Sequence, residues 1–358
     1  MLHTLFLILT AFLLSGCEAQ PQEMVASDAR VNTVGRVEKS ELGVKFDWCG
    51  VYMDVQFEGT RLEVLMSDSD RNFFNLMVDG KECPKFETKG DSLRVVLFDD
   101  PTAEGKHWVR IQKATEAQQG LVTVHSFTTD GKFLTAQEAQ RPLMVEFYGD
   151  SLTCGYGTES KSGNEPFTIE TENCKYTYAV YLADWFGADY RLISHSGRGL
   201  VRNYGDAEPL SDPKQVMTQL ALQTFDAHAE PQWNFAGEER KPDAVVIMLG
   251  TNDFSTKPHP SQADFAEAYV RLIDHLREAY GNPTLPVLCC VHRAEALEAV
   301  KQVVAKLDHV AMTEPLSGLY NQTTEVGASL HPNREGQLRM AEVVIPRFAE
   351  LTGWTKAE

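Results

Sequence analysis

The chain has 358 residues, 43% of them hydrophobic, and a formal net charge of −18. This length is comfortable for two domains, and the apolar content is enough for a hydrophobic core in each. Nucleic acid is disfavoured as a partner, because phosphate binding needs clustered Lys and Arg and the sequence has no such cluster. We therefore expect a soluble globular protein with a neutral or small ligand.

The chain opens with an apolar stretch, residues 5–14, that is too short to span a bilayer but long enough for the core of a signal peptide. The sequence Leu-Ser-Gly-Cys that ends at Cys17 resembles a bacterial lipobox, which implies a lipid on this thiol. We expect residues 1–17 to be a lipoprotein signal peptide, with the exported protein anchored to a membrane by the lipid alone. The alternative is an ordinary secretory signal with a coincidental cysteine. Residues 18–30 are polar and aperiodic, and we expect them to form a tether.

Six cysteines remain after Cys17. An exported protein permits disulfides, but six cysteines in a chain of this size are not a disulfide scaffold, and their pairing cannot be read from the sequence. Cys289 and Cys290 lie in an apolar run, so we expect them to be buried free thiols. No spacing of Cys and His indicates a metal site.

Residues 31–140 are dominated by a period of two. Between positions 51 and 58, apolar residues alternate with Asp54, Gln56 and Glu58, which is typical of a half-buried antiparallel strand. Many short strands with glycine turns and no long helical pattern predict a β-sandwich. Further strands are expected at 62–66, 74–78, 93–97, 108–111 and 121–127.

Residues 141–358 show a different pattern, in which continuous apolar runs alternate with helical periodicity. This pattern predicts a parallel sheet with helices on both faces, and therefore an α/β domain. The expected strands are 143–147, 190–193, 244–249, 287–291 and 310–312. The expected helices are 176–186, 262–280, 294–307 and 334–351.

Polar residues follow the predicted parallel strands, at the edge of the sheet where such folds bind their ligands. Ser151 comes directly after the first strand, Gly197 after the second and Asn252 after the third. His331 lies in the loop before the last helix. A nucleophile, a base and donors for an oxyanion are the parts needed for acyl transfer, so we expect this chemistry here.

The same loops resemble the SGNH or GDSL hydrolase superfamily, and the longer match is to carbohydrate esterase family 2. The blocks that carry the resemblance are residues 149–157, 171–173, 196–200, 249–254 and 331–332, in this order, and 105–107 and 113–116 are similar to the first domain of that family. The resemblance implies a jelly roll for residues 31–140, followed by a flavodoxin-like α/β/α catalytic domain for 141–358.

Carried over position by position, the resemblance implies Ser151 as the nucleophile and His331 as the general base. The backbone N–H groups of Ser151 and Gly197 and the side-chain amide of Asn252 would form the oxyanion hole. Glycine at position 197 would let the backbone approach the substrate. The implied chemistry needs no cofactor and no metal.

One position departs from the superfamily. An Asp often stands three residues before the histidine and orients it, but this sequence has Ala328 there. Carbohydrate esterase family 2 is known for a Ser-His dyad, in which a backbone carbonyl can accept the second ring N–H of the histidine. Leu330 stands where that family often has Trp. Asp308, Glu314 and Glu325 are fallback acids without positional support.

Three further residues have weaker assignments. Asp150 either supports its own loop or affects the nucleophile, and structural support is favoured. Asp253 is expected to cap the turn that follows it. Trp233, in a polar segment, is the best candidate for a contact with a sugar.

We therefore predict an exported, lipid-anchored serine esterase that removes O-acetyl groups from plant polysaccharides such as xylan or glucomannan, through an acetyl-enzyme. Two alternatives stay open. One is an esterase, lipase or thioesterase with a non-carbohydrate substrate, since a fold does not determine its substrate. The other is a carbohydrate-binding lipoprotein whose hydrolase domain is inert.

Overall fold

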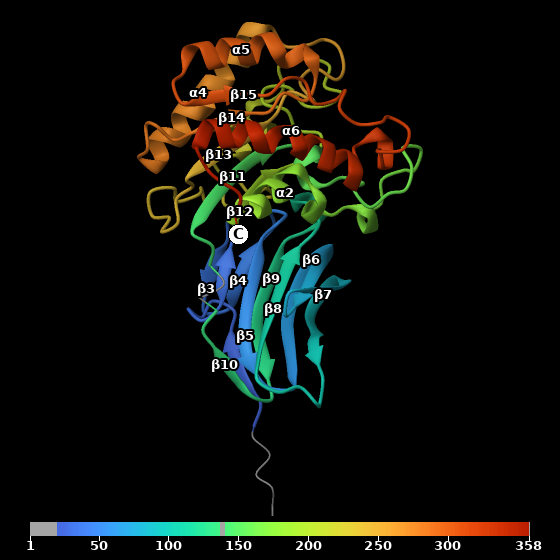
Figure 1. The fold of residues 1–358 in the computed structure, drawn as a ribbon, viewed down its shortest axis with the longest axis vertical. Coiled ribbons are helices and arrows are strands. Elements are labelled where there is room, and N and C mark those ends of the chain that lie inside the picture. Colours follow the sequence, from blue (N-terminus) through green and yellow to red (C-terminus); the bar gives the residue numbers. More distant parts are fainter. Residues whose placement is uncertain (1–19, 137–139, 358) are drawn as a thin grey trace, which may run out of the picture.

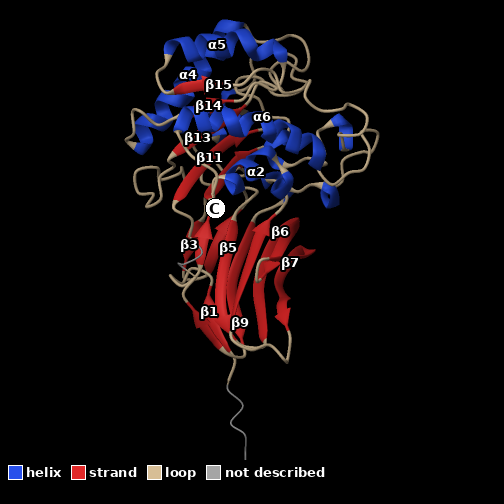
Figure 2. Cartoon of the chain, viewed as in Figure 1, coloured by secondary structure: helices blue, strands red, loops and turns tan. Residues whose placement is uncertain are grey.

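The computed structural model describes residues 20–136 and 140–357, which form an elongated molecule of two domains (Figure 1). The first domain is built from strands, and the second alternates strands with helices (Figure 2). The predicted signal peptide and Cys17 lie outside the described residues. Within the described ranges, no helix has the length and apolarity needed to cross a membrane.

The first domain is a curled antiparallel sheet of ten strands in the part of the chain that the structure describes. The strand order is β10-β5-β8-β6-β9-β4-β3, with β1 joined to β9, β2 to β5 and β7 to β6. The strands are β1 (Gln22–Val25), β2 (Asn32–Val34), β3 (Glu38–Ser40), β4 (Gly43–Phe46), β5 (Tyr52–Glu58), β6 (Arg61–Val78), β7 (Lys81–Asp99), β8 (Lys106–Lys113), β9 (Val122–Thr129) and β10 (Lys132–Leu134).

Strand β5 shows how the alternating pattern forms the core of this domain. Val55 and Phe57 are buried in the curled sheet, as the pattern predicts. Asp54, expected on the exposed face, is also fully buried. The second domain covers this end of the strand, because the hydroxyl of Tyr52 donates to Asp189 of that domain. The outer face of β5 is therefore part of an interface between the domains.

Two strands predicted separately, 62–66 and 74–78, are parts of one long strand, β6. The polar residues between them remain in the sheet because Asp68 is buried and hydrogen-bonded. Its carboxylate accepts hydrogen bonds from Asn72 Nδ2 at 3.0 Å and from Thr88 Oγ1 at 2.5 Å. The pairing of β6 with β7 shifts register on both sides of Asp68, which marks irregular pairing there.

The prediction of a tether for residues 18–30 is wrong for the part that the structure describes. Residues 22–25 form β1, which pairs antiparallel with β9. Met24 and Ala26 are buried in the core of the first domain. Two inward apolar residues are enough to attach a short edge strand, but they are too few to produce a visible period in the sequence. The first domain therefore begins earlier than position 31.

The second domain has a parallel sheet of five strands in the described ranges, in the flavodoxin-like order β12-β11-β13-β14-β15. The strands are β11 (Leu143–Gly149), β12 (Ala188–Ser194), β13 (Ala244–Met248), β14 (Val287–Cys289) and β15 (Val310–Met312). The predicted parallel sheet is confirmed. Its strand order reverses between β11 and β13, the place where open α/β sheets bind ligands.

Helices cover both faces of this sheet, as predicted. Helices α2 and α6 pack together over one face, and α4 and α5 pack over the other. Short α3 had no counterpart among the predicted helices. The helices are α1 (Ser151–Cys154), α2 (Tyr178–Trp185), α3 (Met217–Leu220), α4 (Gln262–Tyr280), α5 (Leu297–Lys306) and α6 (Arg334–Thr352).

Buried polar contacts join the two domains. Arg36 of the first domain is fully buried, with Nη2 2.8 Å from the Tyr148 hydroxyl and 3.2 Å from Glu146 Oε1. Such a buried pair fixes the relative position of its partners, since breaking it would leave an uncompensated charge. The six described cysteines are free thiols, including Cys289 and Cys290, which are buried as predicted.

Candidate active site

Ser151 and His331 meet at the edge of the sheet where the strand order reverses. Ser151 is the first residue of α1, directly after β11, and His331 lies just before α6. Ser151 Oγ and His331 Nε2 are 2.8 Å apart, a normal hydrogen-bond length. Gln337 of α6 donates a hydrogen bond to the carbonyl of Leu152 at 2.9 Å, which ties the two elements together. The structure therefore brings together the residues predicted to be nucleophile and base.

Asp150 stabilises the turn that presents Ser151. Its carboxylate accepts a hydrogen bond from the N–H of Leu152 at 3.0 Å and so caps α1. Burial raises the pKa of Asp150 to about 7. The cap agrees with the structural role favoured from the sequence, while the other carboxylate oxygen, Oδ2, lies 3.5 Å from Asn252 Nδ2.

Ala328 stands where the superfamily often has the orienting Asp, and the side chain at this position is tightly packed. Its side chain is buried against the backbone of Gly157, where an added Cβ would lie 2.7 Å from the Ala328 Cβ. Position 328 is therefore filled by a tight contact between two loops. A carboxylate there would be buried against Gly157.

The second ring nitrogen of His331 is buried and forms no hydrogen bond within the described residues. Burial lowers the pKa of His331, and the backbone carbonyls of Ser329 and Ala328 partly oppose this effect. Ser329 and Leu330 have φ values of 53° and 62°, a left-handed conformation that is rare for residues other than glycine. The carbonyls beside the imidazole therefore belong to a strained segment of backbone.

The three fallback acids do not reach His331 in the described structure. Glu325 binds the N–H of Asn321 and the side chain of Arg339 instead. Asp308 lies before β15, at the opposite end of the sheet from Ser151. Glu314 is exposed. None of the three has a hydrogen bond to His331 in the described ranges, so the geometry is that of a dyad.

An aromatic stack holds the other side of the imidazole, and the sequence analysis gave it no role. The ring of Tyr156 lies on that of His331, with centroids 4.4 Å apart. Phe167 stacks on Tyr156 with centroids 4.1 Å apart. Tyr156 is in the same block as Ser151, but nothing in its spacing indicates a partner 175 residues further along the chain, because both loops must fold before the contact exists.

The predicted oxyanion donors lie around the same edge. Gly197 has a φ of +80°, and the position of a Cβ there would be open space. The side-chain amide of Asn252 donates to the carbonyl of Arg198 at 2.7 Å and has a long contact of 3.5 Å with Asp150 Oδ2, so a ligand would have to compete for its second N–H. No hydrogen bond in the described residues uses the N–H of Ser151 or of Gly197. These two backbone donors are therefore available to a ligand.

The prediction that Asp253 caps its own turn is wrong. Its buried carboxylate accepts hydrogen bonds from the N–H groups of Leu200, Val201 and Arg202, at 2.8 to 2.9 Å. Burial raises its pKa to about 6. Gly199 fits beside it because a Cβ there would lie 2.6 Å from Asp253 Oδ2. Asp253 therefore fixes the loop that carries Gly197.

The first domain supports this loop from the other side. Glu116, which is fully buried, accepts a hydrogen bond from the N–H of Ser196 at 2.8 Å. The carboxylate of Glu172 in turn accepts from the N–H of Glu116 at 3.0 Å. Residues 113–116 and 171–173, two of the blocks that carry the family resemblance, therefore support the loop of Gly197 through these hydrogen bonds.

A cavity of about 540 Å³ opens beside His331, with Leu330, Tyr320 and Arg293 among its lining residues. Trp233 is not near it. The Trp233 ring lies between Arg36 and Arg191, in a pocket with Met144 at the start of β11 and thus at the opposite end of the sheet. The prediction that Trp233 contacts a sugar at this site is therefore wrong.

Two residues that contact Gly197 or adjoin His331 have exposed side chains. Tyr204, which the sequence analysis did not select, donates its N–H to the carbonyl of Gly197 at 2.9 Å, and its side chain is 64% exposed. Leu330, the neighbour of His331, is 58% exposed. Within the described residues, no group of three or more His, Cys, Asp or Glu is arranged to hold a metal ion.

Comparison with known proteins agrees with this architecture. Residues 33–137 match the family described as carbohydrate esterase 2 N-terminal, and residues 147–339 match the GDSL-like lipase/acylhydrolase family. A protein of Cellvibrio japonicus named acetylxylan esterase / glucomannan deacetylase is 28% identical over 320 residues, covering 86% of each chain. The cellulase/esterase CelE of Acetivibrio thermocellus is 36% identical over 252 residues, which are 70% of this chain but only 29% of that longer protein.

The structural comparison gives the same result. A family two carbohydrate esterase from Clostridium thermocellum, solved in complex with cellohexaose, superposes with a TM-score of 0.81 at 30% identity. The match covers 90% of this chain and 99% of that one. The chain therefore belongs to the GDSL-like lipase/acylhydrolase family and has the two-domain architecture of the family 2 carbohydrate esterases.

Proposed function

We propose that this protein is a serine esterase that removes O-acetyl groups from plant polysaccharides such as xylan and glucomannan. The observation that carries the proposal is the hydrogen-bonded pair of Ser151 Oγ and His331 Nε2, together with the N–H groups of Ser151 and Gly197, which form no hydrogen bond within the described residues. The substrate class follows from a relative named acetylxylan esterase / glucomannan deacetylase, which is similar over 86% of this chain.

The reaction has two halves. In the first, Ser151 Oγ attacks the acetyl carbonyl while His331 Nε2 accepts the hydroxyl proton. The N–H groups of Ser151 and Gly197 and the amide of Asn252 bind the oxyanion of the tetrahedral intermediate. Each such donor is worth roughly 3 to 4 kcal/mol of transition-state stabilisation. The C–O bond to the sugar then breaks, and His331 returns the proton to the departing sugar oxygen.

The second half removes the acetyl group from the enzyme. His331 accepts a proton from water, whose oxygen attacks the acetyl-serine carbonyl, and the same donors bind the second oxyanion. The bond to Ser151 Oγ breaks, Oγ takes the proton from His331, and acetic acid leaves and ionises to acetate in solution. In both halves His331 becomes a cation for a short time, without a carboxylate beside it.

Two features compensate for the missing carboxylate. The carbonyls of Ala328 and Ser329 raise the affinity of the buried ring for a proton. The face of Tyr156 lies against the same ring, where its negative electrostatic potential favours the imidazolium form. We assign to these groups the orienting role that Asp has in a triad.

We assign the sugar contact to the exposed ring of Tyr204, next to Gly197. An exposed aromatic side chain, on a residue whose backbone binds that of Gly197, can pack on a sugar ring while the acetyl group enters the site. Leu330 adds an exposed apolar surface on the side of His331. We also propose that the protein is an exported lipoprotein, on the basis of the sequence around Cys17.

The experiment is to measure acetate release by the purified protein from acetylated xylan, acetylated glucomannan and 4-nitrophenyl acetate. We expect Ser151→Ala and His331→Ala each to abolish release from all three. Lipid esters serve as the competing substrates, and a preference for them would overturn the carbohydrate assignment. A wild-type protein that releases no acetate and does not react with a serine-directed probe would be an inert hydrolase domain.

A further inference from the structure

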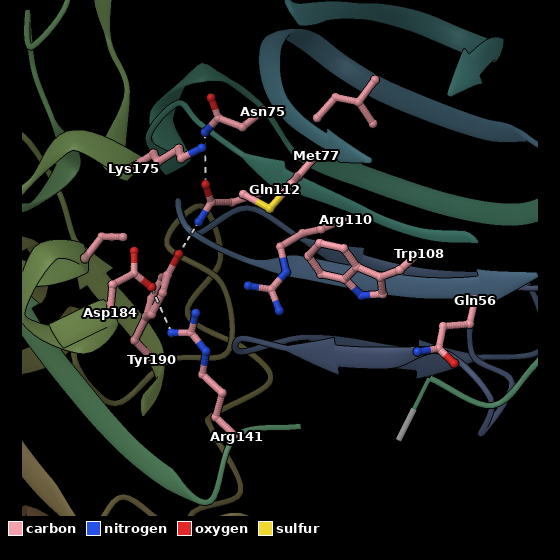
Figure 3. A pocket seen from close by; sticks show the side chains of 12 residues that line it. Gln56, Asn75, Met77, Trp108, Arg110, Gln112, Arg141, Lys175, Asp184 and Tyr190 are labelled. Atoms are coloured by element: carbon pink, nitrogen blue, oxygen red, sulfur yellow. Dashed lines mark hydrogen bonds and ion pairs between the residues drawn. The ribbon is translucent and has the colours of Figure 1, made fainter. Parts of the chain in front are cut away.

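A second cavity, of about 570 Å³, lies at the junction of the two domains (Figure 3). The first domain contributes Gln56 from β5 and Trp108 and Arg110 from β8. The second contributes Arg141, just before β11, and Asp184 of α2. These elements lie at the amino ends of the parallel strands, whereas Ser151 follows a carboxyl end. The cavity is therefore separate from the catalytic site.

Cationic side chains outnumber acidic ones in the lining of the cavity. Arg110, Arg141 and Lys175 all face the cavity, and Asp184 is the one carboxylate among the described residues that line it. Figure 3 shows the guanidinium groups of Arg110 and Arg141 pointing into the same open space. In a protein with a net charge of −18, three cations around one cavity are a local exception.

The cations are held in place from behind. Arg110 uses Nε and Nη2 to bind the buried carboxylate of Asp54 at 2.6 and 2.9 Å, and its Nη1 has no hydrogen bond in the part of the chain that the structure describes. Arg141 uses Nη1 to bind Asp184 at 2.8 Å and the carbonyl of Ala188 at 2.9 Å, and among the described residues its Nη2 has no partner. Lys175 binds Glu82 at 2.6 Å. Side chains that are fixed before binding lose less entropy when a ligand arrives.

The remaining lining suits a sugar better than a small inorganic ion. Trp108 offers an indole surface, and its buried Nε1 has no hydrogen-bond partner in the described residues. The side-chain amide of Gln56, which pairs with Trp108 across the strands, also forms no hydrogen bond within those residues. An aromatic surface with unused planar donors and acceptors matches the apolar face and the hydroxyl groups of a pyranose ring.

We propose that this cavity binds an acidic sugar, a uronic acid unit of a polysaccharide, with its carboxylate between Arg110 and Arg141 and its ring against Trp108. Guanidinium groups are the preferred partners of carboxylates in proteins. The site would hold the polymer at the domain junction while Ser151 acts on an acetyl group elsewhere. The inference rests on the proposed function only for the source of the sugar.

Binding is measured by isothermal titration calorimetry with the full chain carrying Ser151→Ala, so that no hydrolysis interferes. The probes are a xylo-oligosaccharide with one glucuronic acid branch and the unbranched oligosaccharide of equal backbone length. We expect the acidic probe to bind at least about tenfold more tightly, since a charge-assisted hydrogen bond contributes about 1.5 to 3 kcal/mol. Added Arg141→Gln or Trp108→Leu should each remove most of this difference.

Arg347→Gln is the matched control, because Arg347 lies on α6 and forms an exposed ion pair with Glu350. It should leave binding unchanged. All variants are compared for thermal unfolding. The same substitutions are also made in the protein that retains Ser151, where they should leave hydrolysis of 4-nitrophenyl acetate at the wild-type rate. Arg141→Gln and Trp108→Leu test the site from two different domains, so one misfolded variant does not remove the test.

Four results would overturn the proposal. The first is equal affinity for the two probes, and the second is an affinity for the acidic probe that does not change in Arg141→Gln and Trp108→Leu. The third is that neither probe binds. The fourth is that inorganic sulfate binds equally tightly at the same residues. Failure of the proposed function would look different, because a protein without esterase activity would still bind the acidic probe.

Discussion

Tyr156 stacks on His331, with ring centroids 4.4 Å apart and ring planes inclined by 35°. Within the described residues His331 has no carboxylate partner and its Nδ1 has no hydrogen bond, so the ring contact and the hydrogen bond to Ser151 Oγ are the contacts that hold the imidazole. Tyr156 is itself held by Phe167 on its other side. The stack both orients the base and lies against the face of the cation that forms during catalysis.

Replacing Tyr156 tests this role. We expect Tyr156→Leu to lower kcat by roughly 5- to 30-fold, because a cation over an aromatic ring is worth about 1 to 2 kcal/mol in a partly buried site. Tyr156→Phe keeps the ring and should stay within about twofold of the wild type. The pH dependence of kcat separates the roles, since losing the ring should also lower the apparent pKa of His331. An equal loss in both variants would contradict a role of the ring face.

Glu116 of the first domain supports the loop that carries Gly197. Its carboxylate accepts a hydrogen bond from the N–H of Ser196, next to Gly197. We expect Glu116→Ala to lower kcat about tenfold with little change in KM, because a displaced oxyanion donor weakens binding of the transition state more than of the substrate. Glu116→Gln retains an acceptor oxygen and is the matched control. Steady-state kinetics with 4-nitrophenyl acetate measure both, and a wild-type kcat in Glu116→Ala would contradict this role.

Asp253 is expected to matter for stability. Its carboxylate binds three backbone N–H groups of the 200–202 loop. Asp253→Asn puts an NH₂ group where an acceptor is needed, so at least one buried N–H loses its partner. We expect the free energy of unfolding to fall by about 1 to 3 kcal/mol, measured by urea denaturation at constant pH. An exposed acid such as Asp274 on α4, changed to Asn, should have no measurable effect.

The pH dependence of activity follows from the environment of His331. Burial lowers its pKa below the ordinary value of 6.5, with the carbonyls of Ser329 and Ala328 partly opposing this. Because the neutral imidazole is the base, kcat/KM should fall as the pH drops through this lowered pKa, with a midpoint below 6.5. A midpoint near 7 that disappears in Asp150→Asn would show that the carboxyl of Asp150, whose pKa is raised to about 7, controls the rate instead.

Much of the fold could be predicted from local patterns. Continuous apolar runs identified the parallel strands, and α4 begins and ends where helical periodicity placed it. Parallel topology predicts that the loops of Ser151 and His331 lie at one edge of the sheet, and the family resemblance implies their roles as nucleophile and base. Contacts between distant segments left no such pattern. The burial of Asp54, the attachment of residues 22–25 to β9 and the binding of Asp253 to another loop each depend on a partner more than 45 residues away.

Two errors have a common cause. Trp233 was chosen because a polar segment surrounds it, yet Arg36 and Arg191 enclose its ring at the other end of the sheet. Asp253 was assigned to its own turn because caps are usually local. In both cases the neighbouring sequence suggested a role that packing between loops decided differently. Tyr156 and Tyr204 were missed for the same reason.

The central claim is that Ser151 and His331 act as a dyad on acetyl esters without a third acid. The most direct measurement is kcat for acetate release from acetylated xylan by the wild type, His331→Ala, and the variants Asp308→Asn, Glu314→Gln and Glu325→Gln. We expect a loss of at least about 10⁴-fold in His331→Ala, because removing a member of a serine protease triad costs about 10⁴- to 10⁶-fold in kcat, and near wild-type kcat in the three acid variants. A loss in any acid variant as large as that of His331→Ala, with the fold intact, would contradict it.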